Sequence, residues 1–412
     1  MCGGVIVRRF FKDKRTREKC RIFQMLCAQK KGKHLSFHTP GHKQKGFDIT
    51  ELSYSDNLAC PRGCIAQAER EIAEILGAKK SFILTDGSTS GVFSMLQAAK
   101  TLGVKKLFLI EPVHESVYNA CAVLGLNPLS TENGADAVLC TSPDYYGNIV
   151  NLGELRALCD REGKLLLVDG AHGGHLHFDK NLYAGAYADF WVDGVHKSLP
   201  ALTQGAVVSA RTEKQDSALF EAVKLFRTTS PSYPIMASVE YAVKYPRNEN
   251  LEKLVKEYAF TQERVCIQAD WTKLCARVGK SAFEAEKYLE KKGIYAEFCD
   301  GEVVCFYLSP ATREREFKTL CRLLEKAFKK YPYEPVQRNP APLVFKETAG
   351  EWIELTKSEN RVCAANCGLF PPCTPLIKKG EKITKEKIDL LKQANNVYGL
   401  NEGKIYVYRE NK

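Results

Sequence analysis

The chain has 412 residues, of which 44% are hydrophobic and 26% are charged. These values are typical of a globular protein with two or three domains, and they exclude a chain that is mainly disordered. No apolar run approaches the roughly 18 residues of a membrane span, and Arg8 and Arg9 interrupt any signal peptide, so we expect a cytoplasmic protein without a membrane partner.

The net charge of +11 is concentrated near the N-terminus. Between Arg8 and Lys33 the chain carries eleven basic residues against two acidic ones, and the remainder is nearly neutral. A protein-wide nucleic-acid surface is therefore not expected. A solvated helix face or a tail is the simpler interpretation of the basic segment, and contact with a nucleic acid or an anionic surface is the alternative.

The sixteen cysteines do not follow a zinc-binding pattern. No two of them are spaced as CxxC, and the pairs Cys60/Cys64 and Cys363/Cys367 lack a second ligand pair nearby. We therefore expect no metal site. Because no secretory signal precedes them, we expect free, mostly buried thiols instead of disulfides.

Helical and strand patterns alternate through the first 210 residues. A short helical segment at 22–26 and a loop rich in Gly, Pro and His at 38–46 come first. Helices are then predicted at 66–76, 92–100, 114–124 and 152–162, and strands at 81–85, 106–110, 137–141, 164–169, 189–193 and 206–210. Apolar strands separated by helices indicate a mainly parallel sheet, so the fold class is α/β.

The pattern changes after residue 245. Charged helices are predicted at 251–264, 281–292, 314–330 and 385–394, the last with Thr384 as its N-cap, and a strand pair near 295–308. Residues 332–342 are typical of a linker. We expect a basic extension (1–22), a major domain (23–248) and a smaller C-terminal α+β domain (249–412).

Three features at strand ends suggest one cofactor. Asp169 ends an apolar strand, Lys197 follows the next strand, and DGSTSG (86–91) joins a strand to a helix. Alone, each has an ordinary interpretation: a capped turn, a solvated lysine and a helix N-cap. Together they suit pyridoxal phosphate, because a helix N-terminus favours phosphate, a carboxylate pairs with the ring nitrogen and a lysine binds the aldehyde. His114 is predicted at the same sheet edge, where it would stack on the ring unless it is a surface histidine.

Several spaced motifs carry a resemblance to a known family: SFHTPGHK (36–43), DITEL (48–52), DNLACPRGCIAQAE (56–69), TSPDYYG (141–147), VDGAHGGHLHF (168–178), VHKSLPALTQ (195–204), TTSPSY (228–233) and LFPPCTPLIKKGE (369–381). On these motifs the chain resembles the Orn/Lys/Arg decarboxylases of class-I type. The resemblance implies the seven-stranded, mainly parallel sheet of fold-type-I pyridoxal-phosphate enzymes with a smaller C-terminal α+β domain. It also implies the short form, without the N-terminal wing domain.

The resemblance implies a role for each matching residue. Lys197 would bind the cofactor aldehyde, His196 would contact cofactor or substrate, Asp169 would pair with the ring nitrogen, and His114 would stack on the ring. The other expected cofactor contacts are Gly87, Ser88 and Thr89 at the phosphate, His172 near the ring hydroxyl, and Thr203 at the phosphate of a neighbouring subunit. A homodimer with shared active sites is implied.

The implied reaction is α-decarboxylation of lysine, ornithine or arginine to a diamine or agmatine, a step of polyamine biosynthesis. Glu51 and Asp56 are candidates for pairing with the distal cation of the substrate, with surface or capping roles as the alternative. Another fold-type-I reaction, of the aminotransferase, aldolase or desulfurase type, also stays open. An aminotransferase would need an arginine for the substrate carboxylate, for which Arg361 or Arg227 could serve. A relative whose catalysis has lapsed is the third interpretation.

Some positions depart from the family pattern. Gly194 stands where relatives commonly have a hydroxyl residue, so we expect one phosphate contact to be missing, at a cost of about 1 kcal/mol. Gly170 follows the aspartate, and Ala59 stands where many short relatives have histidine. Phe370 and Cys373 depart from the usual YPPGIP. None of these changes removes Lys197, Asp169, His114 or His196.

Overall fold

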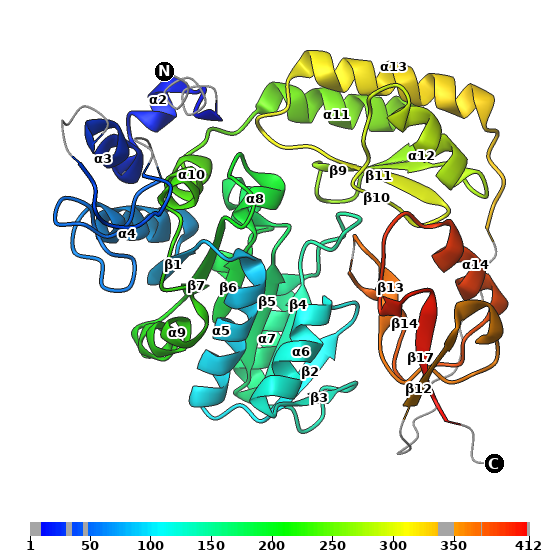
Figure 1. Cartoon of the computed structure of the whole chain (residues 1–412), viewed down its shortest axis with the longest axis horizontal. Coiled ribbons are helices and arrows are strands. Elements are labelled where there is room, and N and C mark those ends of the chain that lie inside the picture. The colour runs from blue at the N-terminus through cyan, green and yellow to red at the C-terminus, as the bar shows by residue number, and fades with distance from the viewer. Residues whose placement is uncertain (1–9, 30–34, 44–47, 337–349, 372, 410–412) are drawn as a thin grey trace. The chain divides into compact units, whose positions relative to one another are not determined.

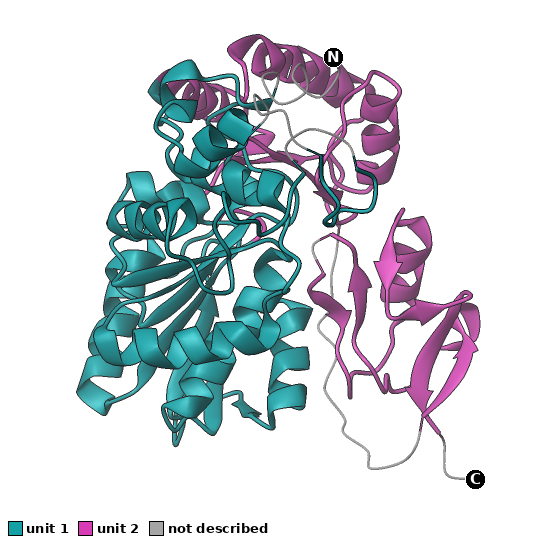
Figure 2. Ribbon diagram, turned by 60° about the vertical axis from the view of Figure 1, so that its left-hand side comes forward, with its two compact units in different colours: residues 1–144, 148–249, 309–311 teal, residues 145–147, 250–308, 312–412 magenta. Residues whose placement is uncertain are grey.

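The computed structural model describes residues 10–29, 35–43, 48–336, 350–371 and 373–409. The chain divides into two compact units, which we describe separately (Figure 2). Unit 1 comprises residues 1–144, 148–249 and 309–311, and unit 2 comprises residues 145–147, 250–308 and 312–412. The three-part division expected from the sequence remains a prediction about domains. Residues 337–342 of the expected linker and 44–46 of the expected loop lie outside the described residues.

Unit 1 is built on one seven-stranded sheet. The strands in spatial order are β1 (Lys80–Leu84), β7 (Ala206–Ala210), β6 (Phe190–Asp193), β5 (Leu165–Gly170), β4 (Ala137–Thr141), β2 (Lys106–Ile110) and β3 (Asn127–Leu129). Only β7 runs antiparallel to its neighbours, and the other pairs are parallel. This sheet confirms the expected mainly parallel α/β fold.

Helices cover both faces of this sheet because its strands are apolar on both sides (Figure 1). Along β5, Leu166 and Val168 belong to one buried cluster, and Leu167 belongs to the other. The first cluster also contains residues of α3 (Arg21–Gln29), α4 (Cys64–Leu76), α7 (Leu152–Glu162) and α10 (Tyr233–Val243). The second contains residues of α5 (Gly87–Thr101), α6 (Glu115–Leu124) and α9 (Glu213–Phe226).

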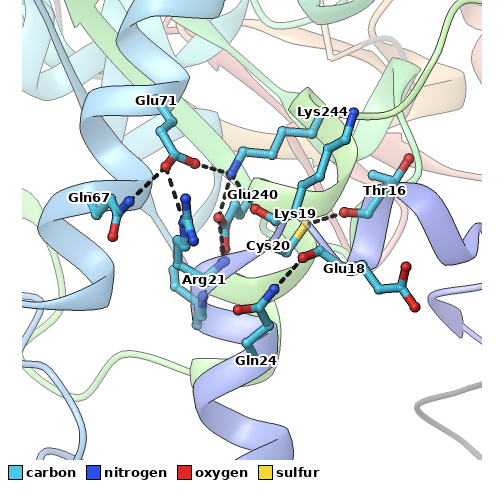
Figure 3. A network of polar contacts seen from close by, with 11 residues as sticks. Thr16, Glu18, Lys19, Cys20, Arg21, Gln24, Gln67, Glu71, Glu240 and Lys244 are labelled. Carbon is cyan, nitrogen blue, oxygen red and sulfur yellow. Dashed lines mark hydrogen bonds and ion pairs between the residues drawn. The ribbon is translucent and has the colours of Figure 1, made fainter.

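The basic N-terminal segment packs into unit 1 through its apolar residues. Phe11, Ile22 and Leu26 are buried, while the basic side chains of α2 (Lys14–Arg17) are not. The first turn of α3 is held by the buried carboxylate of Glu240 on α10, which accepts hydrogen bonds from the backbone N–H groups of Arg21 (2.7 Å) and Ile22 (2.9 Å). Figure 3 shows this network around Glu240, Lys244 and Glu71.

The first part of unit 2 consists of three helices and a four-stranded antiparallel sheet. The sheet order is β10 (Phe298–Cys299), β11 (Val303–Tyr307), β9 (Lys273–Arg277) and β8 (Val265–Cys266). Helices α11 (Glu249–Thr261), α12 (Ala282–Glu290) and α13 (Glu314–Lys330) contribute to the same buried cluster as this sheet. The expected α+β character is confirmed.

The C-terminal part of unit 2 forms two small antiparallel sheets. One joins β12 (Gly350–Glu354), β17 (Lys404–Tyr408) and β16 (Leu400–Asn401); the other joins β14 (Pro375–Ile377), β13 (Cys367–Leu369) and β15 (Val397–Tyr398). Helix α14 (Lys385–Gln393) packs against them, and Thr384 caps it by accepting a hydrogen bond from the N–H of Lys387.

The expected elements of unit 1 are present, but the long helices α9 and α10 went unpredicted, as did the short helices at 14–17 and 195–198 and the strand β3. Helix α9 carries a capping box, in which Thr212 and Gln215 bond each other's backbone N–H groups. The T-x-x-Q pattern at 212–215 was therefore a usable signal. Helix α10 is buried along most of its length, so it lacks the polar face that marks an amphipathic helix. Helix α5 begins at Gly87, five residues before its predicted start.

The described cysteines, Cys20 to Cys373, form no disulfide, and nine of the fifteen are buried, which agrees with the expectation. Within the described ranges, no helix is both long and apolar enough to span a bilayer.

Candidate active site

The predicted site residues of unit 1 follow its parallel strands at their carboxyl ends. Asp169 is the second-to-last residue of β5, and Lys197 lies in α8 (Val195–Ser198), directly after β6. His114 follows β2 as the N-cap of α6, and Ser88 opens α5 after β1. Because parallel strands present their carboxyl ends on one edge, the fold brings these residues to the place where ligands bind open α/β sheets.

Asp169 is a buried carboxylate that is 2% exposed. One oxygen accepts a hydrogen bond from the N–H of Ala171 at 3.1 Å. Among the described residues no basic side chain forms an ion pair with it. A buried carboxylate is costly without a cationic partner, so the position fits a ligand that brings a protonated nitrogen.

Lys197 and His172 contact each other at the same edge. The Lys197 Nζ lies 3.2 Å from the His172 Nε2, and His172 is 2% exposed. The Lys197 backbone N–H also donates to the Gly194 carbonyl at 2.8 Å, which fixes the short turn of α8. The pair can therefore share a proton between amine and imidazole.

His114 is held as a neutral imidazole by its capping bond. Its Nδ1 accepts the backbone N–H of Ser116 at 3.0 Å, so the ring proton belongs on Nε2. Burial lowers the pKa of His114; the Asp169 charge opposes this effect and the Lys197 charge reinforces it. The ring is thus within electrostatic reach of both residues, in a state suited to stacking.

His196 is anchored to Gly205, the residue that precedes β7. Its Nδ1 lies 2.9 Å from the Gly205 carbonyl, which can only accept, so Nδ1 carries the proton. The backbone N–H of His196 donates to the same carbonyl at 3.1 Å. Burial lowers the pKa of His196 despite this bond, which leaves a neutral ring beside Lys197.

The start of α5 provides the predicted phosphate cradle. Gly87 has φ +85°, and its N–H donates to the Gln204 carbonyl at 2.9 Å, so the loop that carries Thr203 lies against the cradle. The hydroxyls of Ser88 and Thr89 bond to no other side chain or backbone group of the described residues. Free hydroxyls at the N-terminus of a long helix suit an anion.

Backbone crowding explains the departure at position 194. A Cβ on Gly194 would lie 2.5 Å from the Ala171 carbonyl oxygen, far inside contact distance. Position 170 is also crowded, since a Cβ added to Gly170 would lie 3.0 Å from the Val192 carbonyl oxygen. The turns after β5 and β6 therefore approach each other too closely for a serine at 194.

The two candidate substrate residues have local roles here. The Asp56 carboxylate accepts backbone N–H bonds from Asn57, Arg62, Gly63 and Ile65, which fixes the loop before α4. These bonds lower the pKa of Asp56 although burial opposes them. Glu51 is exposed and accepts a hydrogen bond from the Thr50 hydroxyl at 2.6 Å. The capping interpretation describes Asp56 well.

Sequence reasoning missed a second buried carboxylate at the end of β6. Asp193 is 1% exposed and accepts a hydrogen bond from the Tyr183 hydroxyl at 2.6 Å, which in turn accepts one from the Trp191 indole at 3.0 Å. Burial raises the pKa of Asp193 to about 7. Its position after an apolar strand, like that of Asp169, was the available signal.

Comparison with known proteins adds to this geometry. The family model described as Orn/Lys/Arg decarboxylase, major domain, matches residues 129–269, which contain Asp169, His172, His196 and Lys197. The chain is 25% identical to the uncharacterized protein YaaO of Bacillus subtilis, over 94% of this chain and 98% of that protein. It is 24% identical to an arginine decarboxylase of Halalkalibacterium halodurans, over 92% and 94%.

The fold has a solved counterpart. The constitutive lysine decarboxylase of Escherichia coli superposes with a TM-score of 0.73 at 18% identity, covering 95% of this chain and 82% of that one. Its likeness extends over both units. The chain is therefore similar to the Orn/Lys/Arg decarboxylases, in sequence to their major domain at residues 129–269 and in fold to a solved lysine decarboxylase over 95% of its length.

Proposed function

We propose that this chain is a pyridoxal-phosphate-dependent decarboxylase that converts lysine, ornithine or arginine to a diamine or agmatine. The observation that carries the proposal is the buried Asp169, which has no ion-pair partner in the described chain and shares a sheet edge with Lys197. When bound, pyridoxal phosphate supplies an electron sink for the bond to the departing carboxylate. The match of residues 129–269 to the major domain of the Orn/Lys/Arg decarboxylases supports that use of the sink.

The residues at the edge fit the parts of this cofactor. Asp169 would pair with the ring nitrogen, Lys197 would hold the aldehyde carbon, and His114 would stack on the ring as a neutral imidazole. The hydroxyls of Ser88 and Thr89 would bind the phosphate, whereas the Gly87 N–H expected to join them already donates to the Gln204 carbonyl and would shape the cradle instead. Asp169 would keep the ring nitrogen protonated because a buried carboxylate is stabilised by a cation beside it.

His172 and His196 would manage protons and orientation. The 3.2 Å contact with Lys197 lets His172 accept a proton from the ammonium or return one to the amine. His196, whose Nδ1 is fixed on Gly205, presents Nε2 as an acceptor. Fixing the substrate carboxylate in one orientation is the main requirement, because positioning is a large part of such a rate enhancement.

The arginines considered for an aminotransferase are already engaged. Arg227 is 7% exposed, donates to the carbonyls of Leu58 (2.6 Å) and Ile83 (3.4 Å), and lies 3.6 Å from the buried Glu69. Arg361 donates to Glu351 and to the Tyr408 carbonyl within unit 2, both under 3 Å. These contacts favour decarboxylation over amino transfer to a keto acid.

We also propose a homodimer in which Thr203 reaches the phosphate of the neighbouring active site. Thr203 is exposed, on the loop whose next residue, Gln204, has φ +76° and accepts the Gly87 N–H. An exposed hydroxyl beside one cradle is available to a second copy of the chain.

Cofactor binding is tested by the visible absorbance of the purified protein with added pyridoxal phosphate. We expect a band that Lys197→Ala abolishes and that the matched surface variant Lys180→Ala keeps. Asp169→Asn should shift the band and weaken cofactor retention at least tenfold. A wild-type protein without any cofactor band would refute the proposal.

A further inference from the structure

Unit 2 contains a small cavity that the proposed reaction does not use. Its volume is about 120 Å³. The walls come from α12, from the segment leading into β10, and from the loops at 369–371 and 394–396. The last two walls are joined by a hydrogen bond from the Phe370 N–H to the Asn396 carbonyl at 3.1 Å. Phe370 and Pro371 belong to the FPPCTP motif, for which the active site gives no role.

The cavity is lined by three carboxylates and no basic side chain. Glu286 and Glu290 stand one turn apart on α12, and Glu297 faces them from the segment before β10. Glu286 is only 8% exposed, and nothing in the described chain donates a hydrogen bond to it or forms an ion pair with it. Burial raises the pKa of Glu286 to about 7, the Glu290 charge adds to this rise, and Lys287 opposes it.

The remaining lining favours an organic cation over a metal ion. Phe283, Phe298 and Phe370 contribute ring surfaces, and a cation near a ring face gains electrostatic energy. Asn395 and Asn396 add amide groups at the other side. In the ranges that the structure describes, no group of three or more His, Cys, Asp or Glu side chains is arranged to hold a metal ion.

We propose that this cavity binds a small amine or guanidine cation that carries no carboxylate. With a volume of about 120 Å³ the cavity suits a short cation and is too small for a peptide. An amino acid is disfavoured because its carboxylate would face Glu286, Glu290 and Glu297. Amines of this class are products of the proposed reaction; that relation rests on the proposed function, whereas the binding itself does not.

The test is calorimetric titration of the full chain, loaded with pyridoxal phosphate, with putrescine and with agmatine. We expect Glu286→Gln to weaken one binding event at least tenfold, because the amide keeps the shape and removes the charge. Glu284→Gln, on the same helix but exposed, is the matched control and should bind like the wild type. Ornithine, arginine and Mg²⁺ should not produce this event.

Thermal unfolding gives a second reading. Without ligand, Glu286→Gln should raise the Tm, since it removes the repulsion from Glu290, and it should lose the rise in Tm that putrescine causes in the wild type. Amine binding to the cavity should persist in Lys197→Ala. A loss of amine binding can therefore be told apart from a loss of decarboxylase activity. Equal amine affinity in wild type and Glu286→Gln, or equal binding of ornithine at this event, would overturn the proposal.

Discussion

Gly194 shows how a single missing side chain shapes the site. The Ala171 carbonyl occupies the place of its Cβ, so a serine there must push the turn that carries His196 and Lys197. We expect Gly194→Ser to destabilise the protein by about 1–3 kcal/mol, as overpacking does elsewhere. It should also lower cofactor retention, although it adds a hydroxyl near the expected phosphate position.

Urea unfolding and bound pyridoxal phosphate measure these two effects. Gly153→Ser is a suitable control, because a Cβ there meets nothing closer than 3.6 Å and the residue lies in the first turn of α7. A Gly194→Ser protein as stable as the control, with tighter cofactor binding, would show that the missing hydroxyl matters more than the crowding.

Asp193 makes stability depend on pH in a predictable direction. Burial raises its pKa in the folded protein to about 7, from an ordinary value of 3.8, so the folded state binds more protons between these two values. The free energy of unfolding therefore falls as pH rises through this window, and the loss is complete above about pH 7. Asp193→Asn removes that dependence.

The prediction concerns the difference between two proteins, so other titrating groups cancel. The free energy of unfolding of Asp193→Asn, taken relative to that of the wild type, should increase by at least about 1 kcal/mol from pH 5 to pH 8. This amount corresponds to a pKa shift of roughly one unit or more. Chemical unfolding at both pH values measures this, with the exposed Glu154→Gln as the control. A difference that is constant across the window would contradict the raised pKa.

Residues at strand ends were predictable because parallel strands place their carboxyl ends together. That rule located Asp169, Lys197 and His114. It did not reveal that the Asp56 carboxylate accepts five backbone N–H groups, three from the loop and two from the first turn of α4, because those bonds need the folded loop. Nor did it reveal the Tyr183–Asp193 contact, since the direction of each side chain depends on strand register.

Among the elements, α3 depends on a residue more than two hundred positions away. Glu240 caps its first turn and pairs with Lys244 at 2.6 Å, and both side chains are at most 8% exposed. Glu240→Ala leaves the buried Lys244 ammonium with Glu71 and the Lys19 carbonyl, and it strips two helix N–H groups of their acceptor. We expect a loss of about 3–5 kcal/mol in the free energy of unfolding.

Circular dichroism during urea unfolding measures that loss. Glu18→Ala is the control, because its pair with Lys14 spans 3.9 Å at side chains that are 74% and 61% exposed and should contribute less than about 0.5 kcal/mol. If the two variants were equally stable, Glu240 would not be the anchor of the N-terminal segment.

The strands and most helices could be read from local patterns, because their periodicity lies in consecutive residues. The places of α2 and α3 could not, since α10 supplies their partners: the Tyr241 hydroxyl accepts the N–H of Asp13, which caps α2, and Glu240 accepts the N–H groups that open α3. The basic residues between Arg8 and Lys33 suggested a solvated face or tail, and only the buried Phe11, Ile22 and Leu26 show that the segment belongs to the core.

Over the whole molecule, the resemblance to a decarboxylase family extends through both units, and the solved relative covers 95% of the chain. Spaced motifs made this resemblance readable from the sequence. The acidic cavity was not readable, because Glu286, Glu297 and Phe370 converge only when α12 and two distant loops are folded together. Proposed catalysis therefore lies in unit 1 and the proposed amine site in unit 2.

The most direct test of the central proposal is release of carbon dioxide from the carboxyl group of lysine, ornithine or arginine by the protein loaded with pyridoxal phosphate. We expect release from one of the three, with the matching diamine or agmatine in equal amount. Lys197→Ala should lower the rate by at least a thousandfold, and Lys180→Ala should leave it unchanged. A protein that holds the cofactor through Lys197 yet releases no carbon dioxide, or forms a keto acid instead, would contradict the account.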